Sequence, residues 1–161
     1  MTDKCSETVR EWLRDVYAME VCAAHLFSKN LDSFKDYPEI YIQLESAAQC
    51  CIENQTRLSI RMQQLGTNYS TVKNLGVEFF GELNNIAMII EDQAVKTILN
   101  LHSYSSLMIS SYQILVVAAE TVKDKETELL CKSLYQQAAC RSEWLSSLLN
   151  FFTKNFFIKI Q

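Results

Sequence analysis

Apolar residues recur at three- and four-residue spacing along four long segments of the chain, which is the pattern of amphipathic helices. The spacing predicts helices over residues 6–28, 38–65 and 91–122, and from 127 to 152 or beyond. The centre of the third segment, residues 107–117, is apolar nearly all round, which is typical of a helix buried between neighbours. Four long helices with short, long and short connections predict a four-helix bundle.

The residues between these segments agree with the predicted helix ends. Pro38 suits the first turn of the second helix, and Gly66 follows the last periodic residue of that helix. The polar run 123–126 predicts a short turn. Residues 67–81 are the least regular part and predict a long connection with a short helix or two. Nothing in this connection marks a domain boundary, so residues 1–161 are expected to form one domain.

The composition supports an all-α fold. The 161 residues include only 3 Gly and 1 Pro, and 48% of them are hydrophobic. Sheets, hairpins and long loops use Gly and Pro in their turns, so their scarcity favours long helices with few turns. The hydrophobic share is typical of a packed domain rather than a disordered segment.

Charge and targeting signals narrow the functional classes. The net charge of −4 disfavours nucleic acid, since that binding depends on neutralising phosphates. Residues 1–7 do not resemble a secretory signal, and apolar stretches such as 114–119 are far shorter than a membrane span. We therefore expect a cytoplasmic protein that does not enter a membrane. Six cysteines without any C-x-x-C pair are expected to be free thiols.

One stretch resembles a known family. Residues 11–21, EWLRDVYAMEV, resemble the first helix of the YciE/YciF ferritin-like family of bacterial stress proteins. Residues 38–39, 105–112 and 143–145 match the later helices of that family in register, and the similarity covers roughly residues 11–156. The resemblance implies a ferritin-like bundle with a carboxylate-bridged metal pair in its interior.

The chain departs from this family where the metal ligands are expected. The ligand position on the first helix matches Glu20, whereas the ligand positions on the other helices carry residues that are not carboxylates. These residues are Ala47 and Cys50 on the second helix, Ser105 and Met108 on the third, and Gln137 and Ala138 on the fourth. Independently of the resemblance, no Asp or Glu occurs between residues 93 and 119, or between 129 and 142. The sequence thus predicts a degenerate di-iron site that holds no metal or other cofactor.

Glu20 is the relic ligand in this interpretation. It lies on an apolar helix face, where a lone carboxylate tends to be protonated or paired. Ser105 or Tyr112 could donate a hydrogen bond to it, and Arg141 or Arg57 could balance its charge. The alternative is a partly exposed carboxylate with no special role.

Other candidate sites have weaker support. Cys22, Cys50, Cys51 and Cys140 could hold zinc together with His25, but their spacing is scattered and favours small buried side chains. The chain has no phosphate loop, dinucleotide fingerprint or H-E-x-x-H zinc motif. We therefore expect a protein that is not an enzyme.

A bundle without its metal ligands suggests a scaffold that binds another protein. The leading hypothesis is an immunity-type inhibitor that neutralises a basic toxic effector, such as a nuclease, by direct binding. Its carboxylates would pair with the effector's Lys and Arg side chains, and exposed aromatic residues would anchor the contact. The candidate residues are Glu78, Glu82, Glu91, Asp92, Asp124, Glu126, Glu128, Phe79 and Phe80.

Two alternatives stay open. The first is a stress-response ferritin-like protein with a residual metal-binding or oxidative role. The second is a structural or oligomeric bundle, such as a homodimer, in which the apolar residues 151–160 form the contact.

Overall fold

The computed structural model describes residues 4–68 and 90–161, and this part of the chain contains helices and no strands. In chain order the elements are α1 (Lys4–Lys29), the 3₁₀ helix η1 (Leu31–Phe34), α2 (Pro38–Gln64), α4 (Gln93–Thr121) and α5 (Lys125–Ile160). They confirm the predicted all-α bundle. The predicted short helices fall largely on residues 69–81, which are outside the described residues.

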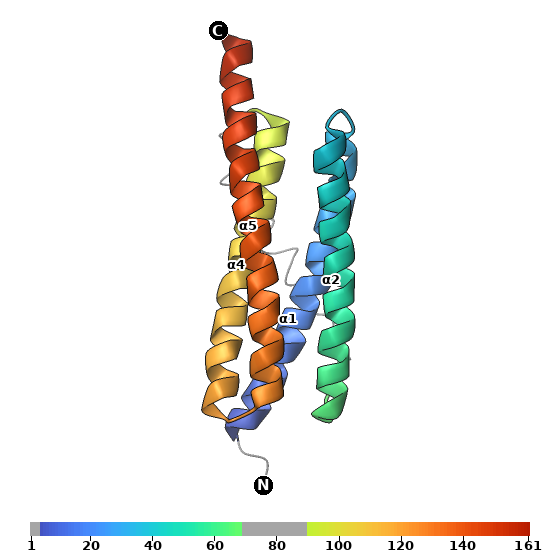
Figure 1. Cartoon of the computed structure of the whole chain (residues 1–161), viewed down its shortest axis with the longest axis vertical. Coiled ribbons are helices and arrows are strands. Elements are labelled where there is room, and N and C mark those ends of the chain that lie inside the picture. The colour runs from blue at the N-terminus through green and yellow to red at the C-terminus, as the bar shows by residue number, and fades with distance from the viewer. Residues whose placement is uncertain (1–3, 69–89) are drawn as a thin grey trace.

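The helices are arranged as two hairpins that pack against each other (Figure 1). α1 and α2 form one antiparallel pair, and α4 and α5 form the other. α1 also packs on α4, whereas α2 meets α5 much less closely. A groove runs along this side of the bundle, between α2 and α5. The C-terminal end of α5 extends beyond the rest of the bundle (Figure 1).

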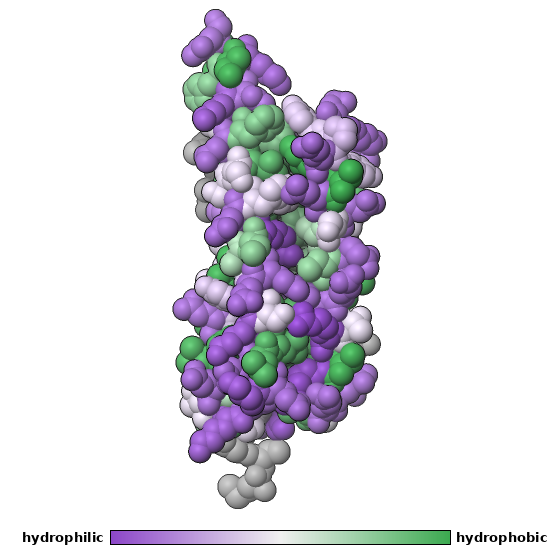
Figure 2. All heavy atoms as spheres, in the orientation of Figure 1, coloured by the Kyte–Doolittle hydropathy of each residue, from purple (hydrophilic) through white to green (hydrophobic). Residues whose placement is uncertain are grey.

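All four long helices contribute to one hydrophobic core, because each carries an apolar stripe with helical spacing. The largest fully buried side chains are Tyr112, Phe27, Phe34, Leu13, Leu44, Leu58, Met62, Ile98, Leu101, Met108, Leu115 and Leu134. The opposite faces are polar, and Figure 2 shows mainly hydrophilic residues over α2 and α5. Within the described part of the chain, no helix has a stretch that is both long and apolar enough to span a membrane.

The sequence also explains where the helices begin and end. Pro38 is the first residue of α2, and Gly66 after α2 adopts a φ of 70°, which glycine tolerates without a Cβ clash. The Asp92 side chain caps α4 by accepting a hydrogen bond from the Val95 amide at 2.9 Å. Asp124 caps α5 in the same way.

A polar clasp fixes the end of α2 against the beginning of α5. The Arg61 guanidinium donates from Nη2 to Asp124 Oδ1 at 2.6 Å and from Nε to Thr127 Oγ1 at 2.9 Å, and it also pairs with Glu126. The Arg61 side chain is only 12% exposed. The same carboxylate that caps α5 therefore also holds α2, which couples the two hairpins at this end.

Replacing Arg61 by Met should lower the free energy of unfolding by about 2 kcal/mol, because it leaves Asp124 and Thr127 without their partner. Burial raises the pKa of Asp124, but the bonds from Thr127 and the charge of Arg61 outweigh it, so the pKa is lowered from 3.8. The stability that this contributes is present above 3.8 and is lost as the pH falls through the lowered pKa. In urea unfolding, the difference in free energy of unfolding between wild type and the Arg61→Met variant should therefore shrink below pH 3.8.

Arg14→Met is the matched control. Arg14 is exposed and lies 4.0 Å from Glu11, so its removal should change stability by less than about 0.5 kcal/mol. If the Arg61→Met variant were no less stable than the Arg14→Met variant, the clasp would not couple the hairpins.

Candidate functional site

Glu20 lies fully buried on the inner face of α1, where side chains from α2 and α4 reach it. Its Oε1 accepts hydrogen bonds from the Tyr112 hydroxyl at 2.5 Å and from Asn54 Nδ2 at 3.2 Å. Its Oε2 has no hydrogen-bond partner, and neither does the buried Ser105 hydroxyl. Burial raises the pKa of Glu20, and the Tyr112 bond and the charge of Arg141 only partly offset this rise. The sequence predicted a hydrogen bond to Glu20 from Ser105 or Tyr112, and the structure shows the bond from Tyr112.

The second charged group of the interior is Arg141 on α5. Its side chain is 8% exposed and reaches residues of the three other long helices. Its Nη1 donates to Cys51 Sγ at 3.5 Å, its Nη2 approaches Met108 Sδ at 3.9 Å, and its guanidinium carbon lies 5.3 Å from the centre of the Phe27 ring. Its Nε has no partner. No ion pair joins Arg141 to a carboxylate among the residues that the structure describes, so this buried cation has only sulfur acceptors and an aromatic face.

These residues do not fit a dinuclear metal centre. Ferritin-like di-iron sites use carboxylates from all four helices together with histidines. Glu20 is the one carboxylate in the described cluster around Arg141, whose other side chains carry amide, hydroxyl, thiol and thioether groups: Asn54, Tyr112, Cys51 and Met108. In residues 4–68 and 90–161, no group of three or more His, Cys, Asp or Glu side chains could hold a metal ion.

The cysteines do not form a ligand set either. None of the six, all of which lie in the described ranges, forms a disulfide; Cys51 and Cys131 are buried, Cys22 and Cys50 half-buried, and Cys140 exposed. Burial raises the pKa of Cys50 and of Cys51, so both thiols stay protonated at neutral pH. Metal ligation and nucleophilic attack need the thiolate, which makes these thiols poorly suited to either. His25 is exposed on α1, away from this interior.

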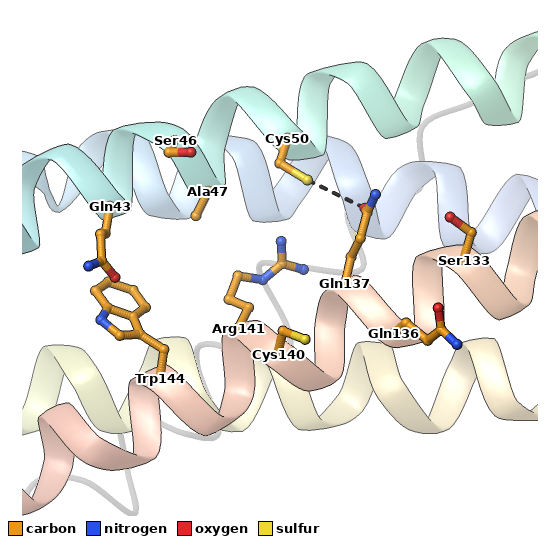
Figure 3. A pocket seen from close by; sticks show the side chains of 10 residues that line it. All are labelled: Gln43, Ser46, Ala47, Cys50, Ser133, Gln136, Gln137, Cys140, Arg141 and Trp144. Atoms are coloured by element: carbon orange, nitrogen blue, oxygen red, sulfur yellow. Dashed lines mark hydrogen bonds between the residues drawn. The ribbon is translucent and has the colours of Figure 1, made fainter.

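The structure separates the family's ligand positions into two places. Ser105 and Met108 are buried, and Met108 Sδ lies 3.9 Å from Arg141 Nη2, whereas Ala47, Cys50 and Gln137 line a groove between α2 and α5 (Figure 3). Within this groove the Cys50 thiol donates to Gln137 Oε1 at 3.4 Å.

Asn54 is the part of the site that the sequence did not identify. Asn54 follows Cys51 by three residues and precedes Leu58 by four, so helical spacing alone puts it on the inner stripe. Arg141 also lies on the inner stripe of its helix, where the sequence suggests it only as a partner for Glu20. A charged residue on the apolar inner stripe of a helix is the sequence signal for a buried cation.

The acidic residues proposed for partner binding have different surroundings. Glu91 is exposed, Asp92 caps α4, and Asp124 and Glu126 pair with Arg61. Glu128 is buried and pairs with Lys132 at 2.6 Å and Lys125 at 2.9 Å; these bonds lower its pKa. The carboxylates at the start of α5 are therefore matched by cations of the same chain. Glu78, Phe79, Phe80 and Glu82 lie outside the described residues.

Solved structures with the same architecture define the class of protein. A protein from Xanthomonas campestris superposes with a TM-score of 0.82 at 23% identity, covering 99% of both chains. A ferritin-like, diiron-carboxylate protein from Bacillus anthracis gives 0.75 at 15% identity, covering 92% of this chain and 99% of that one. A Desulfovibrio desulfuricans bacterioferritin gives 0.78 at 16% identity, covering 97% and 88%. The fold is therefore that of the ferritin-like bundles.

The family follows from the sequence itself. Residues 4–157 match the model of the family described as "Domain of unknown function (DUF892)", and the chain belongs to that family. This membership confirms the resemblance to ferritin-like stress proteins. No curated protein matches the chain.

The immunity-type inhibitor hypothesis is wrong. The family and the solved structures are ferritin-like, which favours the stress-response alternative over a toxin inhibitor. The hypothesis depended on reading lost metal ligands as a sign of a surface-binding scaffold. The structure shows instead a polar interior that is still organised around Glu20 and Arg141.

Replacing Arg141 by Met should make stability more sensitive to pH. The folded pKa of Glu20 is raised, so the stability linked to its proton is present below 4.5 and is lost as the pH rises through the folded pKa. Without the guanidinium, the pKa of Glu20 should rise further. Each unit of that rise adds about 1.4 kcal/mol to the folding stability that is lost as the pH increases. Urea unfolding between about pH 5 and about pH 8 should show a steeper fall for the variant than for wild type.

Glu20→Gln combined with Arg141→Met is the control, since it removes the titrating group. This double variant should lose the added pH dependence. An equally steep fall in the double variant would assign the effect to another group.

Proposed function

We propose that this chain is a stress-response protein of the ferritin-like kind that works without a dinuclear metal centre. The observation that carries the proposal is the buried Arg141 guanidinium, which contacts Cys51, Met108 and Phe27 in the bundle interior. A guanidinium stays charged at every accessible pH, and a divalent ion beside it would meet strong repulsion in a poorly screened environment. The side chain thus supplies the interior with one fixed positive charge.

The proposal includes a non-enzymatic role in the cytoplasm. The Glu20 carboxylate, which lies in the cluster around Arg141, is engaged by Tyr112 and Asn54. The raised pKa values of Cys50 and Cys51 keep the neighbouring thiols in their unreactive form. None of these groups is poised as a nucleophile or as a metal ligand.

A second candidate is a residual metal-binding or oxidative role. Its support is the unpartnered Glu20 Oε2, with two cysteines, Cys50 and Cys51, on the facing helix. It requires thiolates beside a buried carboxylate, whereas burial and the charge of Glu20 raise the pKa of both thiols. The first candidate is therefore the better supported.

The purified protein, prepared without added metal or chelator, should contain far less than one equivalent of iron, manganese or zinc by elemental analysis. It should also not accelerate oxidation of ferrous iron by oxygen above the buffer rate. A ferritin-like di-iron protein assayed in parallel serves as the positive control. One to two equivalents of bound metal would overturn the proposal and support the second candidate.

Arg141→Glu offers a direct test of the repulsion argument. It removes the cation and adds a carboxylate near Glu20, so affinity for Co²⁺ should rise by about tenfold or more. Arg14→Glu is the matched control, because Arg14 is exposed on α1 and does not reach the interior. An equal change in both variants would mean that Arg141 does not exclude metal.

A further inference from the structure

A groove runs between α2 and α5, on the side of the bundle where the two hairpins meet least closely. Its volume is about 530 Å³, which lies in the range of small-molecule sites. Gln43 and Trp144 lie at one end and Ser133 and Gln136 at the other, while Arg141 rises from α5 between them (Figure 3). The groove is open to solvent along the face shown in Figure 2.

The chemistry of the lining is neutral except for Arg141. The other lining residues offer amides, hydroxyls, thiols and one indole: Gln43, Ser46, Cys50, Ser133, Gln136, Gln137, Cys140 and Trp144, together with the methyl group of Ala47. None of these ten residues is a carboxylate. The guanidinium therefore gives the groove a net positive charge, next to groups that can donate hydrogen bonds.

Arg141 lacks the oxygen acceptors that a buried guanidinium normally has. Among residues 4–68 and 90–161, its Nε has no hydrogen-bond partner, and its two other nitrogens have the sulfur atoms of Cys51 and Met108 as their acceptors. Sulfur is a weak acceptor, and the side chain is more than nine-tenths buried. Buried charges are ordinarily paired or fully hydrogen-bonded, so this arrangement indicates a missing anionic partner.

We propose that the groove between α2 and α5 binds a small organic carboxylate, with its carboxylate on the Arg141 guanidinium and its apolar body along Trp144. A guanidinium fork matches a carboxylate in a planar, bidentate geometry. A monoanion fits better than a phosphate dianion, because Arg141 is the one cation among the residues that line the groove. The inference rests on the proposed function, since it needs Arg141 rather than metal as the interior cation.

Benzoate is a suitable probe, titrated in chelator-containing buffer and followed by the indole N–H resonances. Trp144 lies in the groove, whereas Trp12 is on α1 and serves as the internal control. Benzoate should shift the Trp144 signal with a dissociation constant on the order of 1 mM and leave Trp12 unchanged. Neutral benzamide should bind about tenfold more weakly, and inorganic phosphate should not compete.

Two variants separate the charge from the shape of the groove. Arg141→Gln should weaken benzoate binding about tenfold, whereas Arg14→Gln, at an exposed position on α1, should leave it nearly unchanged. If the Arg141→Gln variant does not fold, Gln137→Glu tests the same point by adding a negative charge to the lining: it should weaken benzoate and spare benzamide.

The proposal would be overturned by no Trp144 shift at about 50 mM benzoate, which lies far above the expected dissociation constant. Benzamide binding as tightly as benzoate would also overturn it, as would benzoate binding unaffected by both Arg141→Gln and Gln137→Glu. The chelator removes metal from the titration. Metal found in the purified protein would therefore contradict the proposed function but would not decide whether the groove binds a carboxylate.

Discussion

A permanent positive charge inside an apolar bundle is the constraint on which the rest of this structure depends. Arg141 is desolvated without a carboxylate in ion-pair contact among the described residues, so its surroundings must compensate in other ways. The Phe27 ring and two sulfur atoms provide that compensation, and the Glu20 carboxyl interacts with Arg141 at longer range. These groups come from α1, α2 and α4, which ties those three helices to one side chain of α5.

The same constraint explains why Glu20 keeps its place. Burial favours the protonated carboxyl, whereas Arg141, Tyr112 and Asn54 favour the ionised form, and burial is the larger effect. When Glu20 is ionised, its negative charge acts on Arg141 without a direct ion pair. In ferritin-like di-iron sites, carboxylates face metal ions, whereas Glu20 interacts with a guanidinium at longer range.

Most of the fold could be predicted from the sequence, because helical periodicity, Pro38 and Gly66 are local signals. The absence of carboxylates in the middle of two helices also anticipated the altered interior. The function could not be reached in the same way. Whether Asp124 and Glu128 face a partner or the chain's own cations depends on the folded contacts of each carboxylate. Some of these contacts join residues far apart, such as Arg61 with Asp124, and periodicity does not report them.

Glu20 and Arg141 also differ in whether solvent can reach their parts of the bundle. Glu20 lies where α1, α2 and α4 pack, and it is fully sealed from solvent. Arg141 lies where α2 and α5 leave a groove, so one face of the interior is reached from outside at the position of the cation. A bundle closed by metal–carboxylate bonds would draw all four helices to a common centre. In this chain the Arg61 clasp joins α2 to α5 at one end, and the groove lies where these two helices meet less closely.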